Sequence, residues 1–94
     1  MLRCQVELTK AAKKDLQKVP VYIAEKLEYW VHAVVTFGME KVRQVSGFHD
    51  ESLKGDRMGQ RSIRLNKAYR AIYEETINLE IRIVSIVEVN KHEY

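Results

Sequence analysis

Hydrophobic and polar residues alternate at the start of the chain, between positions 2 and 8. One phase of this alternation holds the apolar residues Leu2, Cys4, Val6 and Leu8, and the other phase is polar. A sustained period of two predicts a half-buried β-strand, with one face on the core and the other in water.

The pattern then changes to a period of three to four, which predicts two successive helices. Thr9 offers an N-cap hydroxyl to the first helix, and Pro20 suits the first turn of the second, where no backbone N–H is needed. Gly38 is a natural end for the second helix. Its wide apolar stripe consists of Ile23, Leu27, Trp30, Val31, Val34 and Val35.

Three further strands are predicted beyond a loop. Residues 47–59 contain three of the chain's four glycines and predict an exposed loop, preceded by a short helical turn. Residues 60–65 and 68–74 have the look of a hairpin around Asn66, because asparagine tolerates the left-handed conformation of a tight turn. The span from Ile77 to Val89 is predicted to form one long central strand, with apolar residues on both faces.

This order, β-α-α-β-β-β, predicts a single α+β domain over residues 1–94. A helical hairpin on one face of a mainly antiparallel, twisted four-stranded sheet is the economical packing. A chain of this length is too short for several domains or a large barrel. The single cysteine, Cys4, excludes an internal disulfide, and the three histidines lack ligand spacing, so we predict no metal and no cofactor. No apolar run approaches the ~20 residues of a membrane span, which predicts a cytoplasmic protein without membrane contact.

The positive charge is concentrated in one segment. The net charge is only +3, from 16 Lys and Arg against 13 Asp and Glu. Between Ser52 and Arg70, however, Asp56 is the only acid. The basic residues of this segment are Lys54, Arg57, Arg61, Arg64, Lys67 and Arg70. Such a local concentration favours binding to a polyanion.

Two of these arginines are expected on the face of the sheet that lies away from the helices. If Ile63 faces the helices, alternation turns Arg64 to the open face. Periodicity does not decide the phase of the next strand, but burying Arg70 unpaired would be costly, so we place it beside Arg64. If the last strand runs to the end of the sequence, His92 and Tyr94 share one side.

Arginines with nearby acid–base groups suit metal-free cleavage of RNA. A general base removes the proton of the 2′-OH, which attacks the adjacent phosphate, and an acid protonates the leaving 5′-oxygen. Fixed guanidiniums stabilise the charge that gathers on the non-bridging oxygens. The need for a 2′-OH makes this chemistry selective for RNA over DNA.

The stretch ESLKGDRMGQRSIRLNKAYRAIY and the ending NKHEY resemble the RelE/ParE superfamily of bacterial type II toxins. Within it, the nearest likeness is to the HigB, YoeB and RelE mRNA interferases. This resemblance implies the same order of elements and cleavage of mRNA, usually in the ribosomal A site, which inhibits translation and growth. It also implies a cognate antitoxin that holds the toxin inactive, with operator DNA bound only through the antitoxin complex.

The resemblance implies a catalytic set: Glu51, Arg70, His92 and Tyr94. With the basic segment it gives a set of phosphate- and RNA-binding residues: Lys54, Arg61, Arg64 and Arg70. The relatives end with His and Tyr adjacent, whereas this chain ends Lys-His-Glu-Tyr. The assignment of general base and acid therefore stays open among Glu51, His49, His92 and Tyr94.

Two other functions stay open as well. Members of the ParE branch share the fold, poison DNA gyrase by binding it and lack the acid–base tail. A catalytically inactive module that binds RNA or an antitoxin is the second alternative. The arginines could also simply pair with cross-strand acids such as Glu74 or Glu88.

Overall fold

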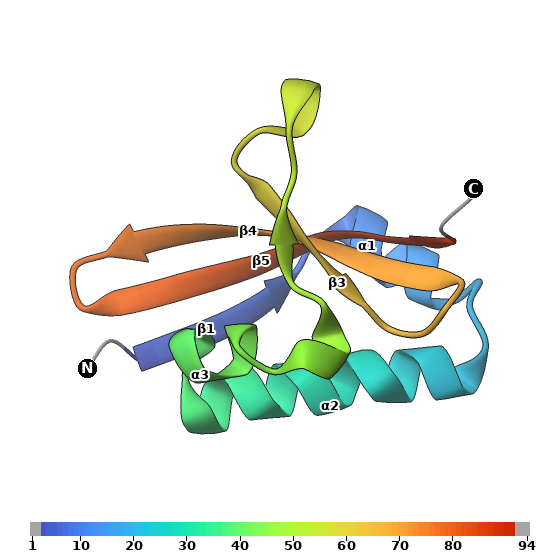
Figure 1. Cartoon of the computed structure of the whole chain (residues 1–94), viewed down its shortest axis with the longest axis horizontal. Helices are drawn as coiled ribbons and strands as arrows, with labels where there is room; N and C mark the ends of the chain where they lie inside the picture. The colour runs from blue at the N-terminus through green and yellow to red at the C-terminus, as the bar shows by residue number, and fades with distance from the viewer. Residues whose placement is uncertain (1–2, 92–94) are drawn as a thin grey trace.

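The elements follow one another in the predicted order, with short additional elements in the middle of the chain (Figure 1). The computed structural model describes residues 3–91. Its elements are β1 (Arg3–Leu8), α1 (Lys10–Leu16), α2 (Val21–Phe37), α3 (Met39–Arg43), the 3-10 helix η1 (Ser46–Phe48), β2 (Glu51–Ser52), the 3-10 helix η2 (Gly55–Arg57), β3 (Gln60–Arg64), β4 (Tyr69–Asn78) and β5 (Ile81–Lys91).

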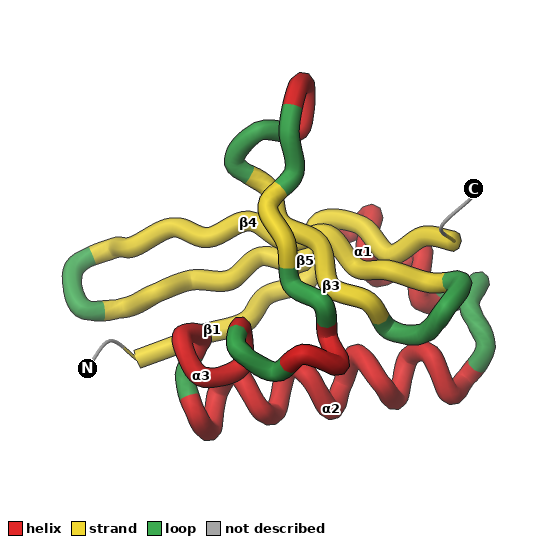
Figure 2. Tube along the Cα trace, viewed as in Figure 1, coloured by secondary structure: helices red, strands yellow, loops and turns green. Residues whose placement is uncertain are grey.

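The strands form one sheet in the order β1-β5-β4-β3-β2. The pair β1–β5 is parallel and the other pairs are antiparallel. The predicted α+β class and the first three predicted strands are thus confirmed, and the two-residue β2, in the predicted loop, adds a strand that was not predicted. The connection between β2 and β3, which carries η2, forms an arm that projects from the body of the sheet (Figure 2).

The predicted single strand from Ile77 to Val89 is wrong. Residues 77–78 end β4, a turn follows at Leu79 with φ 57°, and β5 begins at Ile81. The turn contains two residues, an even number, so the alternation of the sequence continues through it unbroken. Leu79 is 92% exposed at this turn, and burial shifts to the other phase, at Val84 and Ile86.

The helices begin and end where their capping residues predict. Thr9 Oγ1 accepts a hydrogen bond of 3.1 Å from the backbone N–H of Ala12. Helix α2 follows Pro20 and ends at Gly38, whose φ of 90° favours glycine. One stripe of α2 is buried: Ile23, Leu27, Trp30 and Val34. Val35 is 56% exposed, so this stripe is narrower than predicted. In the described part of the chain, no helix is long and apolar enough to cross a membrane.

The face of the sheet toward α2 carries the core. Ala71 and Tyr73 are buried there, on the phase of β4 that excludes Arg70, and so is Ile63, which pairs with Ala71 from β3. The placement of Arg64 and Arg70 on the opposite face is therefore confirmed. A register shift beside Tyr73 changes the phase of β5, which explains why Val89 is buried in addition to residues 84 and 86.

Candidate functional site

A small hollow opens where β2, β3 and β4 meet on the face of the sheet away from α2. The charged and acid–base side chains in its lining are His49, Glu51, Arg64, Lys67 and Arg70. Three of them, at positions 51, 64 and 70, are predicted site residues, and His49 is the alternative acid–base group. The fold therefore brings three of the seven predicted site residues together from separate parts of the sequence.

Strand register places the two arginines side by side. Arg64 on β3 lies directly opposite Arg70 on β4, and such pairs point to the same face. Like charges directly opposite one another on a sheet are destabilising. Within residues 3–91 no ion pair compensates Arg64, which is exposed. A bound anion would relieve this repulsion, which makes the pair a natural site for phosphate.

Glu51 lies between an imidazole and a guanidinium. Its Oε2 is 3.6 Å from His49 Nε2, and its Oε1 is 3.9 Å from Arg70 Nη2. The side chains of His49 and Glu51 are about half exposed, at 56% and 49%, and that of Arg70 is 27% exposed. Ion pairs this long and this exposed contribute little to stability, so a phosphate could replace the carboxylate beside Arg70 at low cost.

The turn between β3 and β4 fixes the spacing of the arginines. Asn66 Oδ1 accepts hydrogen bonds from the backbone N–H groups of Ala68 and Tyr69, at 2.7 and 2.8 Å. This side chain mimics a backbone turn, as expected for asparagine at this position. The predicted hairpin is confirmed.

The other predicted site residues do not line the hollow. Lys54 is exposed on the projecting arm, before η2. Arg61 points to the opposite side of β3, where its Nε donates a hydrogen bond of 2.7 Å to Asp50 Oδ1. His92 and Tyr94 lie outside the described residues.

The acids that could have neutralised the arginines have other partners. Glu88 Oε2 is 2.7 Å from Arg57 Nη2 on the projecting arm. Glu74 Oε2 accepts a hydrogen bond of 3.1 Å from Gln60 Nε2. The first contact ties the arm to β5 and the second joins the paired strands β3 and β4, and neither acid pairs with Arg64 or Arg70 in the described part of the chain.

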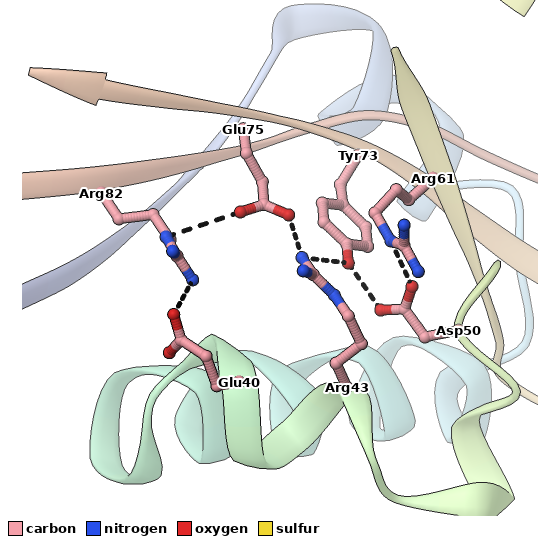
Figure 3. A network of polar contacts seen from close by, with 7 residues as sticks. All are labelled: Glu40, Arg43, Asp50, Arg61, Tyr73, Glu75 and Arg82. Carbon is pink, nitrogen blue, oxygen red and sulfur yellow. Dashed lines mark hydrogen bonds and ion pairs between the residues drawn. The ribbon is translucent and has the colours of Figure 1, made fainter. Parts of the chain in front are cut away.

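A polar network behind the hollow was not predicted from the sequence (Figure 3). At its centre the fully buried carboxylate of Asp50 accepts hydrogen bonds from Arg61 and, at 2.5 Å, from the hydroxyl of Tyr73. Arg43 Nη2 donates to that hydroxyl at 3.3 Å and also pairs with Glu75. The network continues through two further contacts, Arg82 with Glu75 and Arg82 with Glu40.

Burial and charge pairing shift the ionisation of this network. Burial, together with the hydrogen bond to Asp50, raises the pKa of Tyr73 well above its usual range. The phenol therefore stays protonated and can donate. Burial is the largest single influence on Arg61 and would lower its pKa, but the hydrogen bond to Asp50 and the charge interactions with Asp50 and Tyr73 together outweigh it, so the net pKa is raised. One feature of the sequence could have indicated that Asp50 is buried. Asp50 is in the same alternation phase as the core residue Phe48, whereas residues 49 and 51 are in the exposed phase.

The lining of the hollow includes three cationic groups, those of Arg64, Lys67 and Arg70, and the two acid–base groups of His49 and Glu51. It can bind one anionic group and move a proton beside it. Within residues 3–91, no group of three or more His, Cys, Asp or Glu side chains is arranged to hold a metal ion.

Comparison with protein families decides the classification. The sequence profile described as "ParE toxin of type II toxin-antitoxin system, parDE" matches residues 6–93, nearly the whole chain. The chain belongs to this ParE toxin family. The predicted membership of the RelE/ParE superfamily is thereby confirmed, and the protein is a type II toxin-antitoxin toxin. Comparison with curated protein sequences gives no match.

Solved structures of related toxins share this toxin's fold. The YoeB/ParE toxin from Agrobacterium tumefaciens is 17% identical with a TM-score of 0.72, over 95% of this chain and 99% of that one. The toxin-antitoxin complex RelBE2 from Mycobacterium tuberculosis is 22% identical with a TM-score of 0.66, over 94% and 96% of the two chains. The E. coli DinJ-YafQ toxin-antitoxin complex is 15% identical with a TM-score of 0.72, over 97% and 94%. At these identities the likeness establishes a common fold.

Proposed function

We propose that this toxin is a metal-independent endoribonuclease that cleaves mRNA, in the ribosomal A site, by attack of the 2′-OH on the adjacent phosphate. The observation that carries the proposal is the hollow in which Glu51 lies 3.9 Å from Arg70, with Arg64 directly opposite Arg70 on the neighbouring strand. A general base beside two phosphate-binding guanidiniums is the minimum that this reaction needs.

In this proposal four side chains of the hollow have a role. The guanidiniums of Arg64 and Arg70 bind the scissile phosphate and stabilise the charge that develops on its oxygens. Glu51 takes the proton of the 2′-OH once the phosphate has replaced it beside Arg70. His49, 3.6 Å from Glu51, is placed to exchange protons with it or to serve as the acid. Lys54 adds positive charge from the projecting arm, and the predicted roles of His92 and Tyr94 remain part of the proposal.

The proposed partner is an acidic antitoxin segment that covers the basic hollow. Two of the related toxins were solved as toxin-antitoxin complexes, which supports a partner of this kind. A carboxylate of the antitoxin would occupy the place of the phosphate between the two arginines. In this proposal the toxin acts in the cytoplasm and reaches operator DNA only through the antitoxin complex.

The test compares the wild type with Arg70→Ala in a bacterial host, with mRNA 5′ ends mapped by primer extension after induction. Arg3→Ala is the matched control, because Arg3 is an exposed arginine on β1, at the other edge of the sheet. We expect new in-frame cleavage sites with wild type and Arg3→Ala, and their loss with Arg70→Ala. Growth arrest with intact transcripts would contradict the proposal, and harmless expression would indicate an inactive binding module.

A second candidate, poisoning of DNA gyrase, is favoured by the family description, which names parDE. It requires binding alone and no acid–base groups. Incubating the wild-type toxin with purified gyrase and supercoiled plasmid separates the two functions. Accumulated double-strand breaks in the plasmid, without RNA cleavage, would replace the ribonuclease by this second candidate.

A further inference from the structure

The chain alternates between buried and exposed side chains as it enters β2. Phe48 is 4% exposed in the core, and the side chain of Asp50 is completely buried. His49 and Glu51, the residues between and after them, are exposed and line the hollow. His49 and Glu51, the two acid–base groups of the hollow, are therefore carried by a segment that is anchored in the protein interior by Phe48 and Asp50.

The carboxylate of Asp50 is held by two strands at once. Oδ1 accepts from Arg61 on β3 at 2.7 Å, and Oδ2 accepts from the Tyr73 hydroxyl on β4 at 2.5 Å (Figure 3). Tyr73 is itself immobile, since it is fully buried and its ring lies 5.2 Å from that of Trp30. Asp50 can satisfy both donors only in one orientation, which fixes the backbone on either side of it.

The backbone beside this anchor adopts a conformation that needs support. His49 has φ 47° and ψ 52°, the left-handed region that side chains other than glycine rarely adopt. Such a conformation persists where the surroundings determine it. On the other side of Asp50 the chain enters β2, which has only two residues and lies at the edge of the sheet. The pairing of β2 with β3 therefore constrains the position of Glu51 only weakly.

We propose that Asp50 is a positioning residue that holds the Glu51 carboxylate against Arg70, through its hydrogen bonds to Arg61 and Tyr73. The inference rests on the proposed ribonuclease function. Small displacements of a catalytic group lower the rate by up to about 100-fold, so we expect Asp50→Asn to lower the cleavage rate constant roughly 10- to 100-fold. KM changes little, because Arg70 and its neighbour on β3 are held by the β3–β4 hairpin.

The test is a double-mutant comparison in single-turnover cleavage of a defined mRNA on programmed ribosomes. The variants are the wild type, Asp50→Asn, Glu51→Gln and the double variant. If Asp50 acts through Glu51, Asp50→Asn lowers the rate in the wild-type background and has no further effect in the Glu51→Gln background. Asp15→Asn is the matched control, since the Asp15 carboxylate accepts a hydrogen bond from the backbone N–H of Val89 on β5, and β5 contributes no residue to the lining of the hollow in the described part of the chain.

A purely structural role gives a different result. With a purely structural role, Asp50→Asn would lower the cleavage rate by the same factor in the wild-type and Glu51→Gln backgrounds, and this outcome would overturn the inference. An unchanged rate in Asp50→Asn, when Glu51→Gln is impaired, would overturn it as well. Wild-type cleavage by Glu51→Gln removes the proposed role of Glu51 and the inference with it. Circular dichroism confirms folding of each variant, and Tyr73→Phe, which leaves Asp50 paired with Arg61, provides a milder perturbation with the same expected dependence on Glu51.

Hydrogen exchange tests the anchor even where no RNA is cleaved. The backbone N–H of Leu53, just beyond β2, donates to the Gln60 carbonyl at 2.9 Å. We expect its exchange to accelerate at least 10-fold in Asp50→Asn relative to the amides in the middle of α2, and to remain unchanged in Asp15→Asn. Unchanged exchange in Asp50→Asn would overturn the inference independently of the ribonuclease assay.

Discussion

Replacing Tyr73 by phenylalanine isolates the energy of one buried hydrogen bond. Tyr73 is fully buried, and phenylalanine preserves the ring that packs on Trp30. The substitution removes only the hydroxyl that donates to Asp50 at 2.5 Å and accepts from Arg43 at 3.3 Å. No cavity larger than the missing oxygen is created, so the loss of polar contacts accounts for the change.

The expected loss of stability is about 2 kcal/mol. Hydrogen bonds to charged groups contribute about 1.5–3 kcal/mol, and Asp50 keeps its second partner, Arg61, in the variant. For a domain of this size, each kcal/mol shifts Tm by about 4–8 °C, so Tm is expected to fall by about 8–16 °C. The matched control is Tyr29→Phe. Tyr29 is 64% exposed, and its substitution is expected to change the free energy of unfolding by less than about 0.5 kcal/mol.

The pH dependence of this loss provides an internal check. Burial raises the pKa of Tyr73 above the ordinary tyrosine value of about 10. An acid whose pKa is raised on folding stabilises the folded state fully below the unfolded pKa, and this contribution is lost as pH rises. The stability advantage of wild type over Tyr73→Phe is therefore constant near neutral pH and shrinks above about pH 10, by about 1.4 kcal/mol per pH unit.

Urea unfolding followed by tryptophan fluorescence, from pH 7 to pH 11, measures both quantities. Trp30 contacts the substituted ring, so each unfolding curve is calibrated with its own folded baseline. Equal stability of Tyr73→Phe and Tyr29→Phe at neutral pH would refute the assigned hydrogen bond. An advantage of the wild type that grows above pH 10 would refute the direction of the pKa shift.

Three further predictions follow from backbone, core and charge. Gly38→Ala is expected to lower the free energy of unfolding by about 1–3 kcal/mol in urea unfolding, because Gly38 has φ 90°. Gly47→Ala, at a position open to solvent, is the control and is expected to have little effect. Similar losses in both variants would contradict this prediction. Trp30→Ala, at a fully buried site, is expected to cost about 3–5 kcal/mol and to lower Tm accordingly, and a loss below about 1 kcal/mol would show that the core is misassigned. Arg64→Gln is expected to weaken RNA binding at low salt and to flatten its salt dependence, measured by fluorescence anisotropy, and a result equal to that of Arg3→Gln, on the far edge of the sheet, would remove Arg64 from the site.

The strands and helices were predictable where burial followed a simple period. The alternation before Leu8 and the stripe on α2 gave the right elements, and the cost of burying Arg70 gave the right face of β4. Periodicity did not reveal the β4–β5 turn. The turn has two residues, so the alternation of apolar and polar residues continues from one strand into the next as if they were a single strand. Periodicity also failed to predict which residues of β5 are buried, because a register shift moves the buried positions from the phase of Val84 and Ile86 to that of Val89.

The candidate site was predictable only in part. Arg64 and Arg70 follow from strand alternation, and Glu51 from the family pattern, so their meeting in one hollow agrees with the sequence analysis. The assignment of Arg61 could not take account of Asp50, because an aspartate is exposed by default and its burial depends on partners far along the chain. A sequence pattern predicts the face of the sheet to which a side chain points. Whether an arginine on that face pairs with another residue of the protein or binds a ligand depends on tertiary contacts that the pattern does not contain.

The most direct test of the proposed function is the cleavage of a ribosome-bound mRNA that carries a single 2′-deoxynucleotide at the mapped cleavage site. The wild-type toxin is expected to cut the all-ribose mRNA, to leave a 2′,3′-cyclic or 3′-phosphate end, and to spare the substituted mRNA. Equal cleavage of both would contradict attack by the 2′-OH. No cleavage of either, by a toxin that arrests growth, would contradict the ribonuclease function itself.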